Sequence, residues 1–248
     1  MKRIFQLVVC LSLVSSVALA GHGGIGERFF FQIGGTVGAD VMQMTGMFYN
    51  EKNAGNLDDL PIENLNVNLA TVAFVGRVNL LELSNNSSLS LAFRPAASIG
   101  RSINDFGGPS TMLRLPFTFD FNSGAAATVS TRAKTGFVFG IGAEFISYPA
   151  LGDGVTVQKT YVGQGGGQQS NENFINMKAS WIQPVATFGI RFFGKNYSCR
   201  EINFKACYKA AGNVDNKSVV DNAANPYATI GDFKNMGLML SYIQFLNY

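Results

Sequence analysis

The sequence predicts an all-β protein: a closed antiparallel up-and-down transmembrane β-barrel of about eight strands. Three observations indicate this fold class. Hydrophobic residues make up 47% of the 248 residues and charged residues only 14%, against roughly 25% charged residues in an average soluble domain. Segments in which every second residue is apolar recur along the chain, which is the period of a two-faced strand. Short and long polar connections alternate between them, a pattern typical of barrels that cross a membrane.

The first twenty residues have the organisation of a cleaved export signal. Two positive residues precede a short apolar core over residues 4–14, and Ala18-Leu19-Ala20 is a small-x-small cleavage pattern. The apolar core is too short to span about 30 Å of hydrocarbon comfortably, and no later segment is long and apolar enough for a membrane helix. We therefore expect residues 1–20 to be a signal peptide and residues 21–248 to form one barrel domain.

Five segments alternate cleanly between an apolar face and a face of mostly small or polar residues with one or two charges. The non-apolar face is rich in Gly, Ala, Ser and Thr. In chain order, the apolar faces carry Phe29, Phe31, Ile33, Val37 and Ala39; Leu89, Leu91, Phe93, Pro95, Ala97 and Ile99; Leu113, Leu115, Phe117, Phe119 and Phe121; Phe137, Phe139, Ile141, Ala143 and Phe145; and Ile182, Pro184, Ala186, Phe188, Ile190 and Phe192.

Three further segments are less regular. Residues 65–78 alternate only in part, residues 200–208 are short with apolar residues at every second position, and residues 236–248 are apolar on both faces. All eight segments are close to the roughly 9–11 residues that a tilted strand needs to cross a membrane. We therefore expect eight membrane-crossing strands.

The connections between these segments alternate in length. The long polar connections are residues 47–64, 147–176 and 211–232, and the short ones are residues 83–89 and 194–199. Two connections fit this pattern less well: residues 106–111 are short for the long side, and residues 123–135 are long for the short side.

The composition of the two faces indicates which one meets lipid. About eight strands enclose an interior just wide enough for side chains, and glycine-rich faces suit that crowded space, so the phenylalanines are expected to face lipid. A soluble lipocalin-like barrel would reverse this arrangement, with an apolar interior and a polar exterior.

Residues 111–145 carry three short motifs: Leu115-Pro116, then Asn122-Ser123-Gly124, then Gly136-Phe137-Val138-Phe139-Gly140-Ile141-Gly142. They resemble the outer-membrane β-barrel domain family of Gram-negative bacteria, and residues 188–196 and 237–248 resemble the later strands of that family. The resemblance implies a small eight-stranded barrel in the outer membrane, and it carries no shared catalytic residues.

Six charged residues fall on the faces that are expected to line the lumen. They are Asp40, Arg94, Arg114, Asp120, Glu144 and Arg191. Two interpretations fit them: a buried salt-bridge network that plugs the barrel, or a charged constriction that selects small ions. Both predict the same residues, so the sequence does not separate them.

Candidate catalytic and metal sites are scarce. His22 is the only histidine and lies two residues after the expected cleavage site, which argues against a catalytic imidazole and a histidine-based zinc site. We expect no enzyme activity, no metal and no cofactor. The nearly neutral mature chain has no basic patch for a phosphate backbone, so we also expect no nucleic-acid partner.

The cysteines and aromatic residues have structural interpretations. A disulfide between Cys199 and Cys207 suits an oxidising compartment, but it requires the strand between them to bend. Several aromatic residues near strand ends are candidates for membrane-interface girdles, with ordinary β-propensity as the alternative. They are Trp181, Tyr148, Tyr161, Tyr197, Tyr242 and Tyr248.

The sequence therefore predicts a non-enzymatic outer-membrane barrel with a structural, loop-display or adhesive role. Its expected partners are outer-membrane lipid and an extracellular ligand or surface that the long loops contact. Two alternatives stay open: a narrow porin-like channel for small solutes, and a secreted soluble barrel that binds an apolar ligand.

Overall fold

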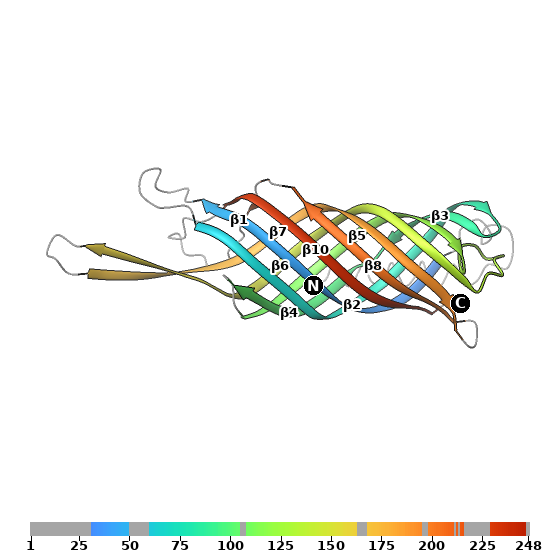
Figure 1. Cartoon of the computed structure of the whole chain (residues 1–248), viewed down its shortest axis with the longest axis horizontal. Helices are drawn as coiled ribbons and strands as arrows, with labels where there is room; N and C mark the ends of the chain where they lie inside the picture. The colour runs from blue at the N-terminus through green and yellow to red at the C-terminus, as the bar shows by residue number, and fades with distance from the viewer. Residues whose placement is uncertain are drawn as a thin grey trace, which may run out of the picture.

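The computed structural model describes residues 31–49, 60–104, 108–162, 168–194, 198–210, 212, 214–215 and 229–246. Over this part of the chain the protein is a single antiparallel sheet that winds obliquely round a long axis (Figure 1). Its strands are β1 (Phe31–Tyr49), β2 (Leu60–Ser84), β3 (Ser87–Phe93), β4 (Ala96–Asn104), β5 (Gly108–Gly124), β6 (Thr135–Val162), β7 (Gln168–Phe193), β8 (Cys199–Lys209), β9 (Val214–Asp215) and β10 (Thr229–Phe245). The described residues include no helix long and apolar enough to cross a membrane.

The sheet closes into a ring because β1 pairs with both β10 and β2. The order round the ring is β1, β10, β8, β7, β6, β5, then β3 with β4, then β2. β3 and β4 are two halves of one strand, since both pair with β2 and with β5. The break falls at Arg94 and Pro95, where proline has no N–H to donate to the ladder. The two-residue β9 pairs only with β10. The closed barrel therefore has eight strand positions, as predicted. We call each position a stave, and β3 and β4 together form one stave.

The two ends of the barrel differ. We call "turn end" the end at which β2 meets β3, β5 meets β6 and β7 meets β8, and "loop end" the opposite one. The first residue of β1 and the last residue of β10 also lie at the turn end, since Gly34 pairs with Phe245.

Side-chain polarity is inverted relative to a soluble protein. Large apolar residues on the outer face are well exposed, with Leu69 at 79% and Phe74 at 71%. Three arginines, Arg77, Arg114 and Arg191, are completely buried inside. A soluble barrel that encloses an apolar ligand requires the opposite distribution, so the structure contradicts that alternative.

The prediction of one long loop is wrong over most of its length. Residues 147–176 were expected to form a long polar loop, but β6 and β7 continue through it and pair from Val155 with Ile175 to Val162 with Gln168. Figure 1 shows this ribbon projecting beyond the barrel at the loop end. The physical reason is local, because Val155, Thr156 and Val157 are β-branched and favour extended backbone even among polar neighbours.

The other connections agree more closely with expectation. β1 reaches Tyr49 and β2 begins at Leu60, so the first long connection is shorter than expected, and residues 50–59 lie outside the described residues. The expected signal peptide also lies outside them, as do most of residues 211–232.

The tight fit of the lumen gives a stability prediction. A Cβ on Gly38 would stand 2.6 Å from the Leu240 carbonyl oxygen and 2.9 Å from the Ser241 Cβ, whereas nothing lies within 4 Å of one on Gly35. We expect Gly38→Val to destabilise the barrel by about 1–3 kcal/mol through overpacking. Gly35→Val is the matched control and leaves stability nearly unchanged. The readout is the temperature at which the folded gel band converts to the unfolded one; equal temperatures for both variants would contradict the packing.

Candidate functional site in the lumen

The lumen nearest the turn end holds a layer of paired charges, which we call the lower ionic layer. Arg77 Nη2 lies 3.0 Å from Asp120 Oδ2 and 3.4 Å from Glu201 Oε2. Arg94 Nη2 lies 2.7 Å from the same Asp120 oxygen, and Arg191 Nε lies 2.8 Å from Glu201 Oε2. The five residues come from β2, the β3–β4 break, β5, β7 and β8, so the layer ties together staves from all round the ring.

Hydrogen bonds complete the coordination of both carboxylates in this layer. The hydroxyl of Thr118 donates to the second oxygen of Asp120 at 2.6 Å, and the amide of Asn203 donates to the second oxygen of Glu201 at 2.7 Å. The ring of Phe245 lies beneath Arg77 and Arg191, 5.5 and 5.6 Å from their guanidinium carbons. Each carboxylate oxygen therefore has a donor, which is the condition for burying charge without a large penalty.

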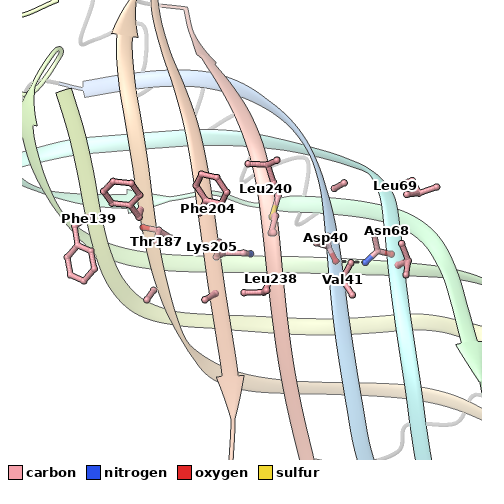
Figure 2. Close-up of a pocket in the computed structure, with 16 residues that line it drawn as sticks. Asp40, Val41, Asn68, Leu69, Phe139, Thr187, Phe204, Lys205, Leu238 and Leu240 are labelled. Atoms are coloured by element: carbon pink, nitrogen blue, oxygen red, sulfur yellow. Dashed lines mark hydrogen bonds between the residues drawn. The ribbon is translucent and has the colours of Figure 1, made fainter. Parts of the chain in front are cut away.

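A second layer of charges, the upper ionic layer, lies closer to the loop end. Arg114 lies 3.6 Å from Asp40 Oδ2 and 3.7 Å from Glu144 Oε1, and Lys205 pairs with the same Glu144 oxygen. Asn68 Nδ2 donates to Asp40 at 2.6 Å. Figure 2 shows this bond, with Asp40 and Asn68 on adjacent strands and Lys205 further round the wall. The layer thus links five staves.

A pocket of about 530 Å³ lies at the wall beside the upper ionic layer. Outward-facing side chains such as Phe204, Leu238 and Leu240 line it together with lumen-facing Asp40 and Lys205 (Figure 2). Its lining is mostly apolar, and its polar members Asp40, Asn68, Thr187 and Lys205 are buried side chains of the lumen.

The structure places all six lumen charges named from the sequence in these two layers. Their exposed fractions range from 0% to 8%, with Arg94 the highest. Three charged partners, Arg77, Glu201 and Lys205, are not among the lumen charges predicted from the sequence. Arg77 falls in the segment that alternates only in part, because register shifts between Asn68 and Ala70 interrupt its period.

A signal for the other two missed residues was present. Glu201 and Lys205 alternate with Ile202 and Phe204, which are exposed on the outer face. The period of two therefore assigns both charges to the lumen.

The turn end is closed by the connection between β5 and β6, which folds back into the barrel. Ala125, Ala126, Ala127 and Thr128 are each at most 1% exposed. The Ala126 carbonyl accepts hydrogen bonds from Gln32 and from Arg191, at 3.3 and 3.1 Å. This segment, which we call the turn-end plug, explains why residues 123–135 are long for a short-side connection.

The loop end is closed by apolar packing. Tyr148 stacks on Trp181 with ring centroids 5.6 Å apart, and Trp181 meets Phe233 edge-on at 4.8 Å. Val214 and Ile230, on either side of the final long connection, belong to the same buried cluster. We call this cluster the apolar cap.

The girdle interpretation is therefore wrong for Tyr148 and Trp181. Both side chains point into the lumen, where their aromatic rings fill the end of the barrel. Tyr242 does face outward and is 37% exposed. The side chains of Tyr161, Tyr197 and Tyr248 lie outside the described part of the structure.

Cys199 and Cys207 are both buried free thiols. Cys199 pairs with Phe193 at one end of β8, and Cys207 pairs with Val185 towards the other. The strand runs without a register shift between them, so the bend that a disulfide requires is absent. Among the described residues, no group of three His, Cys, Asp or Glu side chains is arranged to hold a metal ion. His22 lies outside those residues.

Comparisons with known proteins identify distant structural neighbours. No protein-family model matches the chain, and no curated protein matches it. Ail, the attachment invasion locus protein of Yersinia pestis, solved in complex with the heparin analogue sucrose octasulfate, aligns at 10% identity with a TM-score of 0.36 over 87% of this chain and 99% of its own. The outer membrane protein OprG from Pseudomonas aeruginosa aligns at 10% identity with a TM-score of 0.39, over 88% of this chain and 96% of its own.

The paired charges give a second stability prediction. Glu201→Ala leaves Arg77 and Arg191 without their shared carboxylate in a buried site, so we expect a loss of about 3–5 kcal/mol. Glu82→Ala removes an exposed carboxylate from β2 and serves as the control, with a change within about 0.5 kcal/mol. Urea unfolding in detergent measures both. A similar midpoint for the two variants would show that the lower ionic layer does not hold the barrel together.

Proposed function

We propose that this chain is a non-enzymatic outer-membrane β-barrel with a sealed lumen, which anchors and displays the β6–β7 ribbon at the cell surface. The turn end faces the periplasm and the loop end faces outward. This proposal rests mainly on one combination of features: the lumen is filled along its length, and the ribbon extends beyond it.

The outer face supports the membrane location. Large exposed side chains such as Phe119, Ile182 and Leu238, at 63–65% exposed, come from staves all round the ring. A belt of this size on a closed barrel without free edges is what the hydrocarbon of a bilayer requires. In water it would be a large exposed apolar surface.

The filled lumen favours a sealed scaffold over a channel. From the turn end to the loop end it contains the turn-end plug, the lower ionic layer, the upper ionic layer and the apolar cap. A conducting pore needs charged groups that face a water path. Here the charged groups face each other, and most are completely buried.

The ribbon supports a display role. The last residue of β6 that pairs with β5 is Leu151, opposite Ser110, and the first residue of β7 that pairs with β8 is Val185, opposite Cys207. Beyond these points, in the described pairings, β6 and β7 pair only with each other. An isolated two-stranded hairpin is at best marginally stable in water, and its free edges can pair with an extended segment of another molecule. Contact with an external surface is therefore the role that this ribbon fits.

Conductance separates the scaffold from the channel. We expect the purified protein to show no stable open level in a planar lipid bilayer, because both ends and both ionic layers obstruct the lumen. The same preparation, run unboiled on a gel, should migrate as a compact band that shifts on heating. Reproducible single-channel steps absent from a detergent-only control would overturn the sealed-lumen proposal.

Ribbon removal tests the display role. Replacing residues 153–175 by an Asn-Gly turn joins β6 to β7 near the barrel rim. We therefore expect a folded, membrane-bound barrel, and bacteria that carry it should adhere less to cultured epithelial cells than bacteria with the wild type. Gly35→Val keeps both ribbon and barrel and is the matched control, with adhesion like that of the wild type. Unchanged adhesion of the shortened barrel would remove the ribbon from the function.

A further inference from the structure

Exposed charges at the turn end are unevenly distributed round the barrel. Arg132, Lys134 and Arg200 lie on or beside β6, β7 and β8, and none of them is buried. In the described part of this end, the exposed carboxylate is Glu82 on β2, which lies four staves from β7. Among the described residues, one side of the turn end therefore carries three cations and the opposite side carries Glu82.

Arg200 is held at the edge of the outer face. It is in register with Phe192 of β7 and with Gln244 of β10. Its guanidinium lies over Gly194, so close that a Cβ there would be 3.2 Å from Cζ and 3.3 Å from Nε. Its Nε is buried and has no hydrogen-bond partner within the described structure. The packing against Gly194 thus fixes the position of this guanidinium at the turn end.

Lys134 is positioned beside this arginine. The backbone N–H of Phe193 donates to the Lys134 carbonyl at 3.0 Å, which ties the connection before β6 to the end of β7. Thr135 pairs with Phe192, and Phe192 pairs with Arg200. Two strand spacings, about 10 Å, therefore separate Arg200 from Thr135, the residue that follows Lys134. Two long side chains can reach one phosphate group across that distance.

The surroundings match the boundary between headgroups and hydrocarbon. Tyr242, on the next stave, faces outward and donates its hydroxyl to Gln244 at 3.3 Å. Amphipathic aromatic residues prefer this level of a bilayer. Further towards the middle of the barrel, Ile190, Ile202 and Phe204 are 39–51% exposed and apolar. The cations lie at the level of headgroups, and the apolar residues lie where acyl chains run.

We propose that Arg200 and Lys134 bind the phosphate group of an anionic phospholipid in the leaflet around the turn end. A zwitterionic lipid brings its own ammonium group to the site, which the two cations repel, whereas phosphatidylglycerol does not. This lipid site goes beyond the display role and rests on the membrane location alone.

Native mass spectrometry of the detergent-extracted full chain tests the site, with dioctanoyl phosphatidylglycerol and dioctanoyl phosphatidylcholine as probes. We expect the wild type to bind phosphatidylglycerol more tightly than phosphatidylcholine. Each cation near a membrane surface contributes roughly fivefold to attraction of anionic lipid, so Lys134→Gln with Arg200→Gln should lower phosphatidylglycerol binding by roughly 25-fold. The matched control is Arg101→Gln with Lys234→Gln, which removes two exposed cations near the loop end and should leave that preference in place.

Equal binding of the two lipids by the wild type, or an equal loss in both double variants, would overturn the site. Unboiled gels of each variant show whether it is folded. If the first double variant lacks the folded band, Lys134→Gln alone takes its place, because Lys134 lies outside the strands, with an expected loss of roughly fivefold. A wild-type protein that shows no heat-dependent shift and fractionates away from membranes would instead refute the membrane location.

Discussion

The interior of this barrel depends on one electrostatic constraint: a charge inside a narrow closed wall is stable only when opposite charge and hydrogen bonds surround it. Five cations and four carboxylates fill the two ionic layers. Asp120 and Glu201 each serve two arginines, while Glu144 serves Arg114 and Lys205. Because the partners come from different staves, these pairs also specify which strands face each other across the lumen. The network therefore holds the strands together across the lumen and also obstructs the lumen.

The glycines of the lumen face make this packing possible. A Cβ on Gly189 would stand 2.7 Å from Glu201 Oε1, and one on Gly140 would stand 2.6 Å from the hydroxyl oxygen of Thr187. The long charged side chains occupy the space that larger residues on these staves would need. The aromatic residues of the same segments lie on the other face, where lipid can accommodate them. The contrast between phenylalanine and glycine in these strands thus reflects two different solvents on the two sides of one wall.

Closure at both ends separates the membrane anchor from the parts that can contact other molecules. The turn-end plug is held by carbonyl groups that accept bonds from lumen side chains, and the apolar cap is held by aromatic stacking. The ribbon residues 155–162 and 168–175 pair with each other beyond the rim.

The sequence by itself determined the central part of each stave, the number of staves and the inward direction of six lumen charges, because a period of two is a local property that needs no knowledge of the partner strands. It missed Arg77 where a bulge interrupts the period. It also made Tyr148 and Trp181 candidates for the lipid interface, because position near a strand end does not reveal the face.

Only the tertiary structure decided which charges pair, that residues 125–128 fold back into the lumen, and that residues 147–176 extend as a ribbon. The charge pairing and the position of residues 125–128 depend on ring closure, which brings residues far apart in sequence, such as Arg77 and Glu201, within 3.4 Å. Strand periodicity carries no information about distances across the lumen, and those distances set the pairing of the charges.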